Sequence, residues 1–220
     1  MTALDLIAHD IPALRIEQTG RDAYHLLSDH HVKHLPVVDG RRLVGIISEE
    51  DIFNHRIYEP VSTYDFSMLR TFFVRADEHL FDIMRVMGEN RLTVIPVVDE
   101  EGNYLGMVSQ NTMLRSFSET TAFAMPGGTL ILEISRKDYS MITIARCVEE
   151  ESARILTAVI SSTPDAEMLE VTLKINREDV TRIVAALERY GYTIKRSFAE
   201  DVYSEGVRER YDSLMNYINM

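Results

Sequence analysis

The sequence predicts a mixed α/β (α+β) chain in which a duplicated helix-strand-strand-helix unit is followed by a βαββαβ domain. Two observations carry this prediction. Residues 22–48 and 82–109 repeat each other, and the hydrophobic pattern changes in character after Ser118. Apolar residues three and four apart indicate helices, whereas apolar residues that alternate with polar ones indicate strands.

The duplication can be followed residue by residue. The tripeptide Pro36-Val37-Val38 recurs as Pro96-Val97-Val98, and Ser48 recurs as Ser109. One extra residue in the turn at 100–103 shifts the register of the second copy. Turns are where a duplicated unit tolerates insertions, so the two copies are expected to share one fold.

Each element of the first repeat has its own signal. Residues 22–31 place apolar side chains at helical spacing, and the apolar runs 35–38 and 43–47 flank an Asp-Gly turn, which predicts a hairpin. Ser48 to Asp51 reads as a helix start, a cap residue followed by acids. Because proline lacks an N–H, Pro36 is expected to confine its strand to a sheet edge or to stand at the strand's opening.

The second half follows a different pattern. Turn residues at 124–128 mark a linker. Strands are expected at 129–135, 156–160, 169–175 and 194–198, and helices at 139–152 and 178–190. This order is the ferredoxin-like split βαβ unit. The predicted boundaries are 1–60 and 61–119 for the repeats, 120–127 for the linker, 128–198 for the second domain and 199–220 for a C-terminal amphipathic helix.

Composition limits the partners and the compartment. The chain carries 35 acidic against 23 basic residues, a net charge of −12, which disfavours binding to a phosphate backbone. The N-terminus lacks the basic and apolar regions of a signal peptide, and no apolar stretch approaches the ~20 residues of a membrane span. A single cysteine, Cys147, fits a reducing compartment. We therefore expect a soluble, cytoplasmic protein with no nucleic-acid or membrane partner.

The two repeats resemble CBS domains, the cystathionine β-synthase module, over residues 1 to about 119. The motifs P-V-V-D and G-h-h-S-x-x, where h is apolar, recur in order and twice. The resemblance implies a tandem pair, or Bateman module, whose repeats pack through their strands. It also implies adenine nucleotides or related adenosyl ligands in the clefts between repeats, and pairs that assemble into homodimeric discs.

The resemblance also assigns a ribose contact. In that family the motif G-h-h-[ST]-x-x-D supplies a carboxylate that accepts hydrogen bonds from ribose hydroxyls. The first repeat matches it with Ser48 and Asp51, whereas the second has Ser109 and Thr112. A carboxylate forms hydrogen bonds about twice as strong as a neutral group does, so the first cleft is expected to bind more tightly.

Basic side chains ahead of the proline face phosphates in family members. The first repeat has Lys33 and His34 there, and the second has Thr93 and Val94. This asymmetry again favours the first cleft. The alternative is that Lys33 and His34 are only polar residues at a helix-to-strand junction and that Ser48 only caps a helix.

The segments that open the repeats complete the predicted clefts. Residues 11–13 and 71–73 line an adenine pocket in the family, and an aromatic ring at Phe72 or Phe73 could stack on the base. The alternative places at least one of these rings in the core, because adjacent strand residues face opposite sides. The predicted ligand-binding residues are Ile11, Pro12, Ala13, Lys33, His34, Leu35, Pro36, Ser48, Asp51, Phe72, Phe73, Val94, Ile95, Pro96, Ser109 and Thr112.

Three histidines invite a metal interpretation. His30 and His34 are four residues apart and flank His31, but a strand is expected to begin near His34. That break in helical register separates the rings, and no cysteine or carboxylate completes a set at recognised spacing. We expect solvated histidines and no metal site.

The second domain resembles an ACT domain, a regulatory module that commonly binds amino acids at a dimer interface. Its first strand-to-helix loop, residues 135–140, lacks the glycine that usually lets the ligand approach the backbone. We therefore expect dimerisation but no amino-acid binding. The whole layout resembles the acetoin utilisation regulatory proteins of the B type.

No motif for a nucleophile, a metal protease or a phosphate loop is present, so no catalytic residue and no required cofactor are predicted. Two functions remain open. One is a regulatory sensor, a homodimer that binds AMP, ADP, ATP or S-adenosylmethionine and signals through the ACT-like domain to a protein partner. The other is a constitutive oligomerisation or adaptor module with vestigial clefts.

Overall fold

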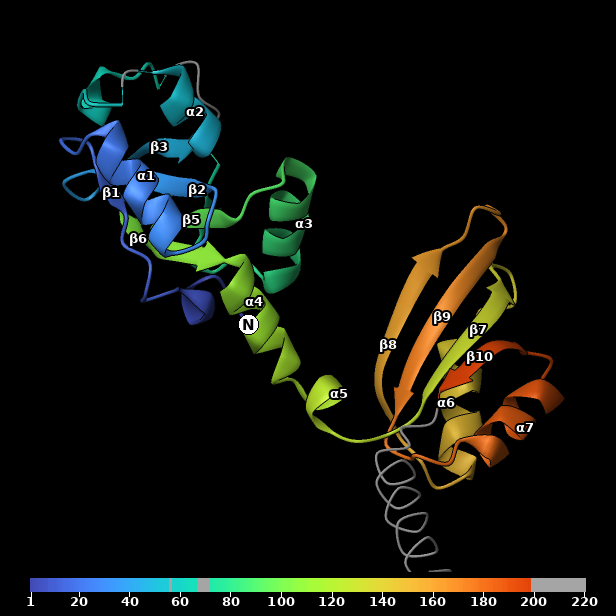
Figure 1. The fold of residues 1–220 in the computed structure, drawn as a ribbon. Helices are drawn as coiled ribbons and strands as arrows, with labels where there is room; N and C mark the ends of the chain where they lie inside the picture. The colour runs from blue at the N-terminus through green and yellow to red at the C-terminus, as the bar shows by residue number, and fades with distance from the viewer. Residues whose placement is uncertain (56, 67–71, 199–220) are drawn as a thin grey trace, which may run out of the picture. The chain divides into compact units, whose positions relative to one another are not determined.

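The computed structural model describes residues 1–55, 57–66 and 72–198 of the chain. It divides into two compact units, Met1–Phe117 and Ser118–Met220. Figure 1 labels most of the helices and strands of both units. The predicted C-terminal helix at 199–220 lies outside the described residues.

The first unit contains the two repeats. Its elements are η1 (Leu4–Leu6), β1 (Leu14–Arg15), α1 (Gly20–Asp29), β2 (His34–Asp39), β3 (Arg42–Ser48), α2 (Glu49–Asn54), η2 (Val61–Thr63), β4 (Val74–Arg75), α3 (Leu80–Asn90), β5 (Val94–Val98), β6 (Tyr104–Ser109) and α4 (Gln110–Ser118). They form two equivalent sheets, β1-β2-β3 and β4-β5-β6. The duplicated α/β unit is confirmed.

Each sheet has one strand more than predicted. The strands β1 and β4 are two residues long, too short for a periodic signal, and they pair in parallel with β2 and β5. The expectation that Pro36 confines its strand to an edge or to its opening residue was wrong. β2 is central and Pro36 lies within it, but β1 pairs only with Val37 and Val38, so no β1 partner faces the proline.

Side-chain caps fix where α1 and α2 begin. Thr19 accepts a hydrogen bond from Asp22 N, and the Asp22 carboxylate accepts one from Thr19 N at 2.9 Å. This capping box starts α1 at Gly20, two residues before the predicted start. Ser48 and Asp51 form the same box at the start of α2, as the sequence predicts.

The chain segment before each repeat packs on the other repeat. Residues 1–8 run along the second repeat, where Ala8 N donates to Met107 O at 2.8 Å, and residues 57–66 run along the first. The main-chain bonds correspond: Ala3 N and Leu4 N donate to Glu78 O and Ala76 O at 2.9 and 3.0 Å, and Val61 N and Ser62 N donate to Gln18 O and Ile16 O at 2.7 and 2.9 Å. Each repeat is therefore completed by chain from outside itself.

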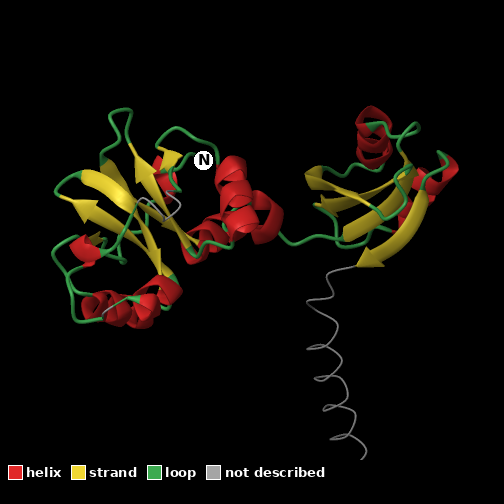
Figure 2. Cartoon of the chain, turned by 90° about the horizontal axis from the view of Figure 1, so that it is seen from above, coloured by secondary structure: helices red, strands yellow, loops and turns green. Residues whose placement is uncertain are grey.

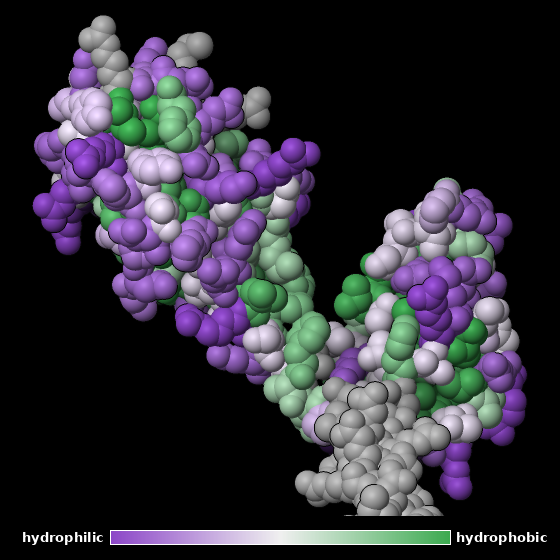
Figure 3. All heavy atoms as spheres, viewed as in Figure 1, coloured by the Kyte–Doolittle hydropathy of each residue, from purple (hydrophilic) through white to green (hydrophobic). Residues whose placement is uncertain are grey.

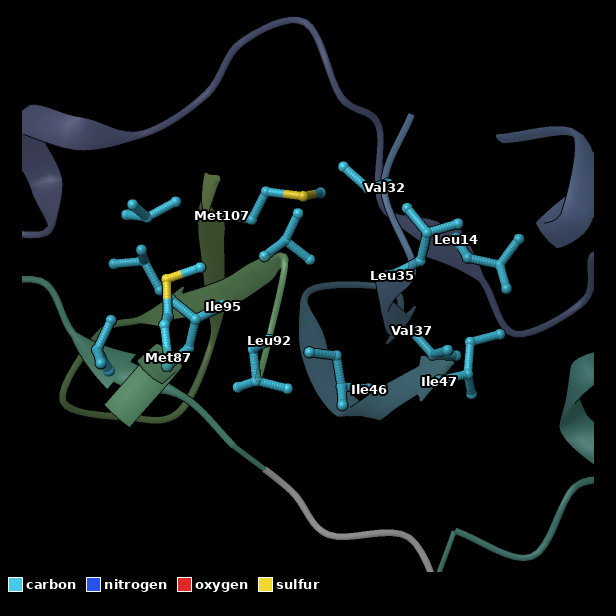
Figure 4. Close-up of a cluster of buried hydrophobic side chains, with 14 of the residues drawn as sticks. Leu14, Val32, Leu35, Val37, Ile46, Ile47, Met87, Leu92, Ile95 and Met107 are labelled. Atoms are coloured by element: carbon cyan, nitrogen blue, oxygen red, sulfur yellow. The ribbon is translucent and has the colours of Figure 1, made fainter. Parts of the chain in front are cut away.

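One hydrophobic core serves both repeats. Buried side chains from β1, β2 and β3 meet those from α3, β5 and β6 without interruption. Figure 4 shows part of this core, in which Ile46 of the first repeat and Leu92 of the second lie between the other labelled side chains of the two repeats. Burying this apolar surface binds the two repeats into one body.

The second unit is a four-stranded antiparallel sheet with two longer helices. Its elements are α5 (Thr121–Ala124), β7 (Thr129–Ser135), α6 (Met141–Glu150), β8 (Ile155–Ser162), β9 (Met168–Ile175), α7 (Thr181–Arg189) and β10 (Thr193–Phe198). The strand order is β10-β7-β9-β8. Both longer helices pack on one face of the sheet, as Figure 2 shows. The βαββαβ prediction is confirmed.

The predicted linker region contains the short helix α5 and then two glycines fixed against the second unit. A Cβ on Gly127 would strike the carbonyl oxygen of Ile175, and one on Gly128 would lie 3.0 Å from that of Arg177. Gly128 N donates to Arg177 O at 2.6 Å. These glycines are present because the backbone passes too close for a side chain.

We expect Gly20→Ala to destabilise the first unit by about 1–3 kcal/mol, because an added methyl group overpacks a closed site. A Cβ there would meet the Tyr64 hydroxyl and lie 3.2 Å from Ile57 Cα. Gly88 in α3 is the matched control, because nothing lies within 4 Å of its Cβ position. Gly88→Ala is expected to leave stability unchanged or raise it by up to ~1 kcal/mol.

Urea unfolding of the purified chain measures both effects. The Tyr64 hydroxyl is buried without a hydrogen-bond partner among the described residues, so Tyr64→Phe should restore part of the stability that Gly20→Ala removes. Equal shifts for the two glycine variants would contradict this account of the packing.

Candidate functional site

Strand register brings the predicted polar residues of each repeat together. In the first repeat His34 pairs with Ser48 across β2 and β3, and in the second Val94 pairs with Ser109 across β5 and β6. Both pairs lie at the strand ends away from the hairpin turns. The register thus produces two equivalent positions with different chemistry.

The first position holds a carboxylate. Asp51 Oδ2 accepts hydrogen bonds from Ser48 N at 2.7 Å and from Ser48 Oγ at 2.6 Å, and Asp51 N donates to Ser48 Oγ at 3.2 Å. Both residues are half-buried. The other carboxylate oxygen, Oδ1, accepts no hydrogen bond from a described residue. The pair therefore caps α2 through Asp51 Oδ2 and leaves Asp51 Oδ1 as an unused acceptor among the described residues.

The second position is neutral and closed. Ser109 and Thr112 are both buried, their hydroxyl oxygens lie 2.9 Å apart, and Thr112 N donates to Ser109 Oγ at 3.0 Å. The hydroxyl pair satisfies itself within the helix cap. A buried neutral pair offers a ligand less than a half-buried carboxylate does.

His34 is held by the opposite repeat. Its Nδ1 lies 3.1 Å from Thr93 Oγ1 and 3.2 Å from Thr93 N, and Lys33 N donates to Thr93 Oγ1 at 2.9 Å. Burial holds the pKa of His34 below its usual value. The nearby Asp51 carboxylate raises this pKa, and the Lys33 ammonium group lowers it further. A lowered pKa favours the neutral ring. The contact between His34 and Thr93 could not be predicted from the sequence, because the two residues are 59 positions apart.

Most of the apolar residues predicted for the clefts belong to the core. Leu35, Pro36, Val94, Ile95 and Pro96 are buried. Ile11 and Ala13 are half-buried and pack against the core, and Pro12 is exposed. The side chains of the buried residues therefore do not line an open site.

The two phenylalanines separate. Phe72 packs against the core, whereas Phe73 is 47% exposed. Phe73 lines a cavity of about 320 Å³ with Arg42, Arg75 and the turn Asp99–Gly102. That turn joins β5 and β6 at the end opposite Ser109, so the structure does not bring Phe73 to the hydroxyl pair.

The histidines do not converge. α1 ends at Asp29 and β2 begins at His34, so the helical register breaks between them as predicted. His31 is exposed, and the Nδ1 of His34 is engaged by Thr93. In the part of the chain that the structure describes, no three His, Cys, Asp or Glu side chains gather closely enough to hold a metal ion.

The first strand-to-helix loop of the second unit is held by its own side chains. Ser135 Oγ donates to Asp138 Oδ2 at 2.8 Å, and Arg136 Nε donates to Ala166 O at 2.6 Å. A cavity of about 420 Å³ lies beside it, lined by Glu133, Ile134, Ser135, Asp138, Ser140, Thr143, Met168, Tyr190, Gly191, Tyr192 and Thr193. Its described lining thus contains two carboxylates and no lysine or arginine.

Comparison with known proteins shows the family to which the chain belongs. The duplicated fold is that of a tandem domain pair. A sequence model of the CBS domain matches residues 3–58 and 63–119, which together make up just over half of the chain. The chain belongs to the CBS domain family, and the two repeats are its tandem domains.

Curated relatives match about half of the chain. An uncharacterized protein of Methanocaldococcus jannaschii is 30% identical over 105 residues, covering 48% of this chain and 40% of the relative. A homoserine O-acetyltransferase of Methanocorpusculum labreanum is 26% identical over 114 residues, covering 51% of this chain and 23% of the relative. The chain thus spans less than half the length of either relative.

Two solved structures are also similar. A CBS domain pair/ACT domain protein of Thermotoga maritima is 22% identical, with a TM-score of 0.47, covering 55% of this chain and 99% of that one. CBSX2 in complex with AMP is 25% identical, with a TM-score of 0.43, covering 53% and 95%. Among the helices that the structure describes, none has the length and apolar character that crossing a membrane requires.

We expect no free amino acid to bind at residues 136–140. The loop lacks glycine, and the cavity beside it offers two carboxylates that would repel a ligand's own carboxylate. Amide NMR of the full chain during titration with each of the twenty amino acids checks this. Saturable shifts centred on residues 136–140 would contradict the expectation and indicate an amino-acid sensor.

Proposed function

We propose that this protein is a non-catalytic regulatory sensor whose first CBS repeat binds an adenosine-containing ligand. The observation that carries the proposal is the half-buried Ser48–Asp51 pair beside His34. Asp51 Oδ1 is the ribose acceptor, and the Nε2–H of His34 and the ammonium group of Lys33 face the phosphate side of the ligand. Ile11, Pro12 and Ala13 supply the base-facing segment.

A capping box alone does not make a ligand site. Thr19 and Asp22 form the same box on α1 with nearly the same distances, 2.9 and 2.7 Å to the carboxylate, but these two hydrogen bonds are exposed. The Ser48–Asp51 box differs because it is half-buried and paired across the sheet with a histidine. This difference favours the ligand-binding function over a purely structural cap.

We expect Asp51→Ala to weaken binding of AMP far more than Thr112→Ala does. Losing a charge-assisted hydrogen bond costs about 1.5–3 kcal/mol, and losing a neutral one about 0.5–1.5 kcal/mol. Isothermal titration calorimetry of the full chain measures both. Asp22→Ala is the matched control, because it removes the same kind of cap outside the cleft and should leave affinity unchanged.

Equal losses for Asp51→Ala and Thr112→Ala would reject the assignment of the first cleft. A loss for Asp22→Ala as large as for Asp51→Ala would show that helix capping, not ribose contact, explains the effect. A prior thermal-shift screen with AMP, ADP, ATP and S-adenosylmethionine selects the ligand, since a ligand at 100 times its Kd adds ~2.7 kcal/mol of stability.

The assembly we propose is a homodimer formed through the helices of the first unit. Exposed apolar side chains recur at equivalent positions of the two repeats: Tyr24 and Phe53 on α1 and α2, and Met84 and Leu114 on α3 and α4. The rings of Tyr24 and Phe53 meet edge to face at 5.7 Å. Figure 3 shows apolar patches on the surface of this unit. A repeated apolar surface suits a second copy related by a two-fold axis.

Light scattering at micromolar protein is expected to give twice the chain mass of 25.2 kDa. The double variant Phe53→Glu/Leu114→Glu should give a monomer, because two buried carboxylates would be desolvated at the interface. Ile142→Glu, at an exposed apolar position of α6 in the second unit, is the comparison. A monomer from Ile142→Glu and a dimer from the double variant would refute this interface.

The role we propose for the second unit is that of an ACT-like regulatory domain that passes the ligand state to a protein partner. Its βαββαβ order and one-sided sheet support the assignment. The competing function is a constitutive adaptor with vestigial clefts, and it is distinguished by the same calorimetry, because an adaptor would bind none of the four adenosyl ligands.

A further inference from the structure

Thr93, at the junction between α3 and β5 of the second repeat, makes all of its described side-chain hydrogen bonds to the first repeat. Its hydroxyl accepts a hydrogen bond from Lys33 N at 2.9 Å and lies 3.1 Å from His34 Nδ1. Its own N–H donates to the same Nδ1 at 3.2 Å. One residue of the second repeat therefore forms hydrogen bonds with two residues that the proposed function places in the first cleft.

These contacts determine which ring nitrogen of His34 carries the proton. An N–H group cannot accept a hydrogen bond, so Nδ1 must present its lone pair to Thr93 N. The Thr93 hydroxyl already accepts from Lys33 N, which leaves its own proton free to donate to Nδ1 as well. With Nδ1 an acceptor, the neutral ring carries its proton on Nε2.

The remaining nitrogen is available to a ligand. Nε2 has no hydrogen-bond partner among the described residues, and it lies on the side of the ring away from Nδ1. Ser48 is the cross-strand partner of His34, and the charges that act on the ring are the Asp51 carboxylate from α2 and the ammonium group of Lys33, the residue just before β2. The ring therefore stands beside the proposed ribose acceptor with an unused N–H.

We propose that Thr93 is a positioning residue for the first cleft: it fixes the neutral Nε2–H tautomer of His34, so that the ring offers the ligand one hydrogen-bond donor of fixed direction. The ligand-facing part of this inference rests on the proposed function, whereas the tautomer does not. Selectivity follows, because a fixed N–H favours ligands with an acceptor oxygen at that place, such as a phosphate or a ribose hydroxyl.

The equivalent contact is lacking in the reverse direction. Thr93 corresponds to Lys33 and His34 to Val94, so the second repeat has an apolar, fully buried side chain where the first has the imidazole. Only the first cleft receives a positioned donor. The device thus reinforces the difference already made by Asp51 and Thr112.

The test is 15N–1H NMR of the histidine rings in the full chain without ligand, assigned through His34→Gln. Wild type is expected to show His34 protonated on Nε2 with Nδ1 as an acceptor. Thr93→Val keeps the shape and the backbone N–H but removes the hydroxyl that donates to the neutral ring, so it should raise the protonated fraction of Nδ1 and move the titration of His34 upward. Thr93→Ser restores the hydroxyl and should restore both signals.

Wild-type His34 protonated on Nδ1, or identical titrations for Thr93→Val and Thr93→Ser, would overturn the proposal. AMP titrations at pH 8 then test the ligand-facing part, and Thr93→Val should weaken binding about two- to tenfold, as expected for one neutral hydrogen bond. If wild type binds none of the adenosyl ligands while the tautomer is as expected, the proposed function fails and the positioning of the ring stands. Unchanged affinity in Thr93→Val, with a shifted tautomer, would show that the ligand does not use this donor.

Discussion

The structure of the first unit depends on a reciprocal exchange of chain segments between its two repeats. Residues 1–8 complete the second repeat, and residues 57–66 complete the first. Main-chain hydrogen bonds at equivalent positions fix both segments, and the buried side chains form one continuous core. Because neither repeat can satisfy its backbone or bury its apolar surface alone, the two repeats form a single body with a seam between them.

Equivalent backbone positions in the two repeats of this unit carry different side chains. Where one residue of a contacting pair differs between the repeats, its partner differs too. The first repeat packs Tyr64 against Gly20, so that a large ring faces the smallest residue, whereas the second repeat has a buried Leu80 at the position equivalent to Gly20. Tyr64 also stacks on His55, with ring centres 4.2 Å apart. Likewise, Asp51 and His34 stand at positions where the other repeat has Thr112 and Val94. One fold thereby provides one polar position and one closed, neutral position at equivalent strand ends.

The position of His34 shows how the seam serves the site. Its environment is shared between repeats, since Ser48 and Asp51 come from its own repeat and Thr93 from the other. A group that binds the ring therefore acts on a residue that contacts both repeats. This is the physical basis on which a small ligand could alter the relation between the repeats, provided that it binds two arrangements with different affinity.

The second unit solves a different problem, the covering of one sheet face. Alternate residues of β7 and β9, such as Leu132 and Val171, point into the core with α6 and α7, and the opposite face carries polar residues including Glu133, Glu170 and Lys195. Lys195 Nζ lies 2.8 Å from Glu170 Oε2 on that face. This regular alternation of apolar and polar residues is why the strands of this unit could be predicted from the sequence.

The sequence by itself determined the duplication, the helix and strand order of both units and the unequal polar residues of the two repeats, because each is recorded in local spacing or in direct alignment. Ser48 and Asp51 could be predicted as a pair since a capping box spans four residues. Only the tertiary structure decided the rest. The two-residue strands β1 and β4 are too short to show a periodic pattern in the sequence. The exchange of segments 1–8 and 57–66 depends on main-chain hydrogen bonds, which side-chain patterns do not predict. Thr93 contacts His34 although the two are 59 residues apart in the chain. The displacement of Phe73 to the turn end and the burial of Leu35 and Ile95 likewise follow from how two sheets share one core.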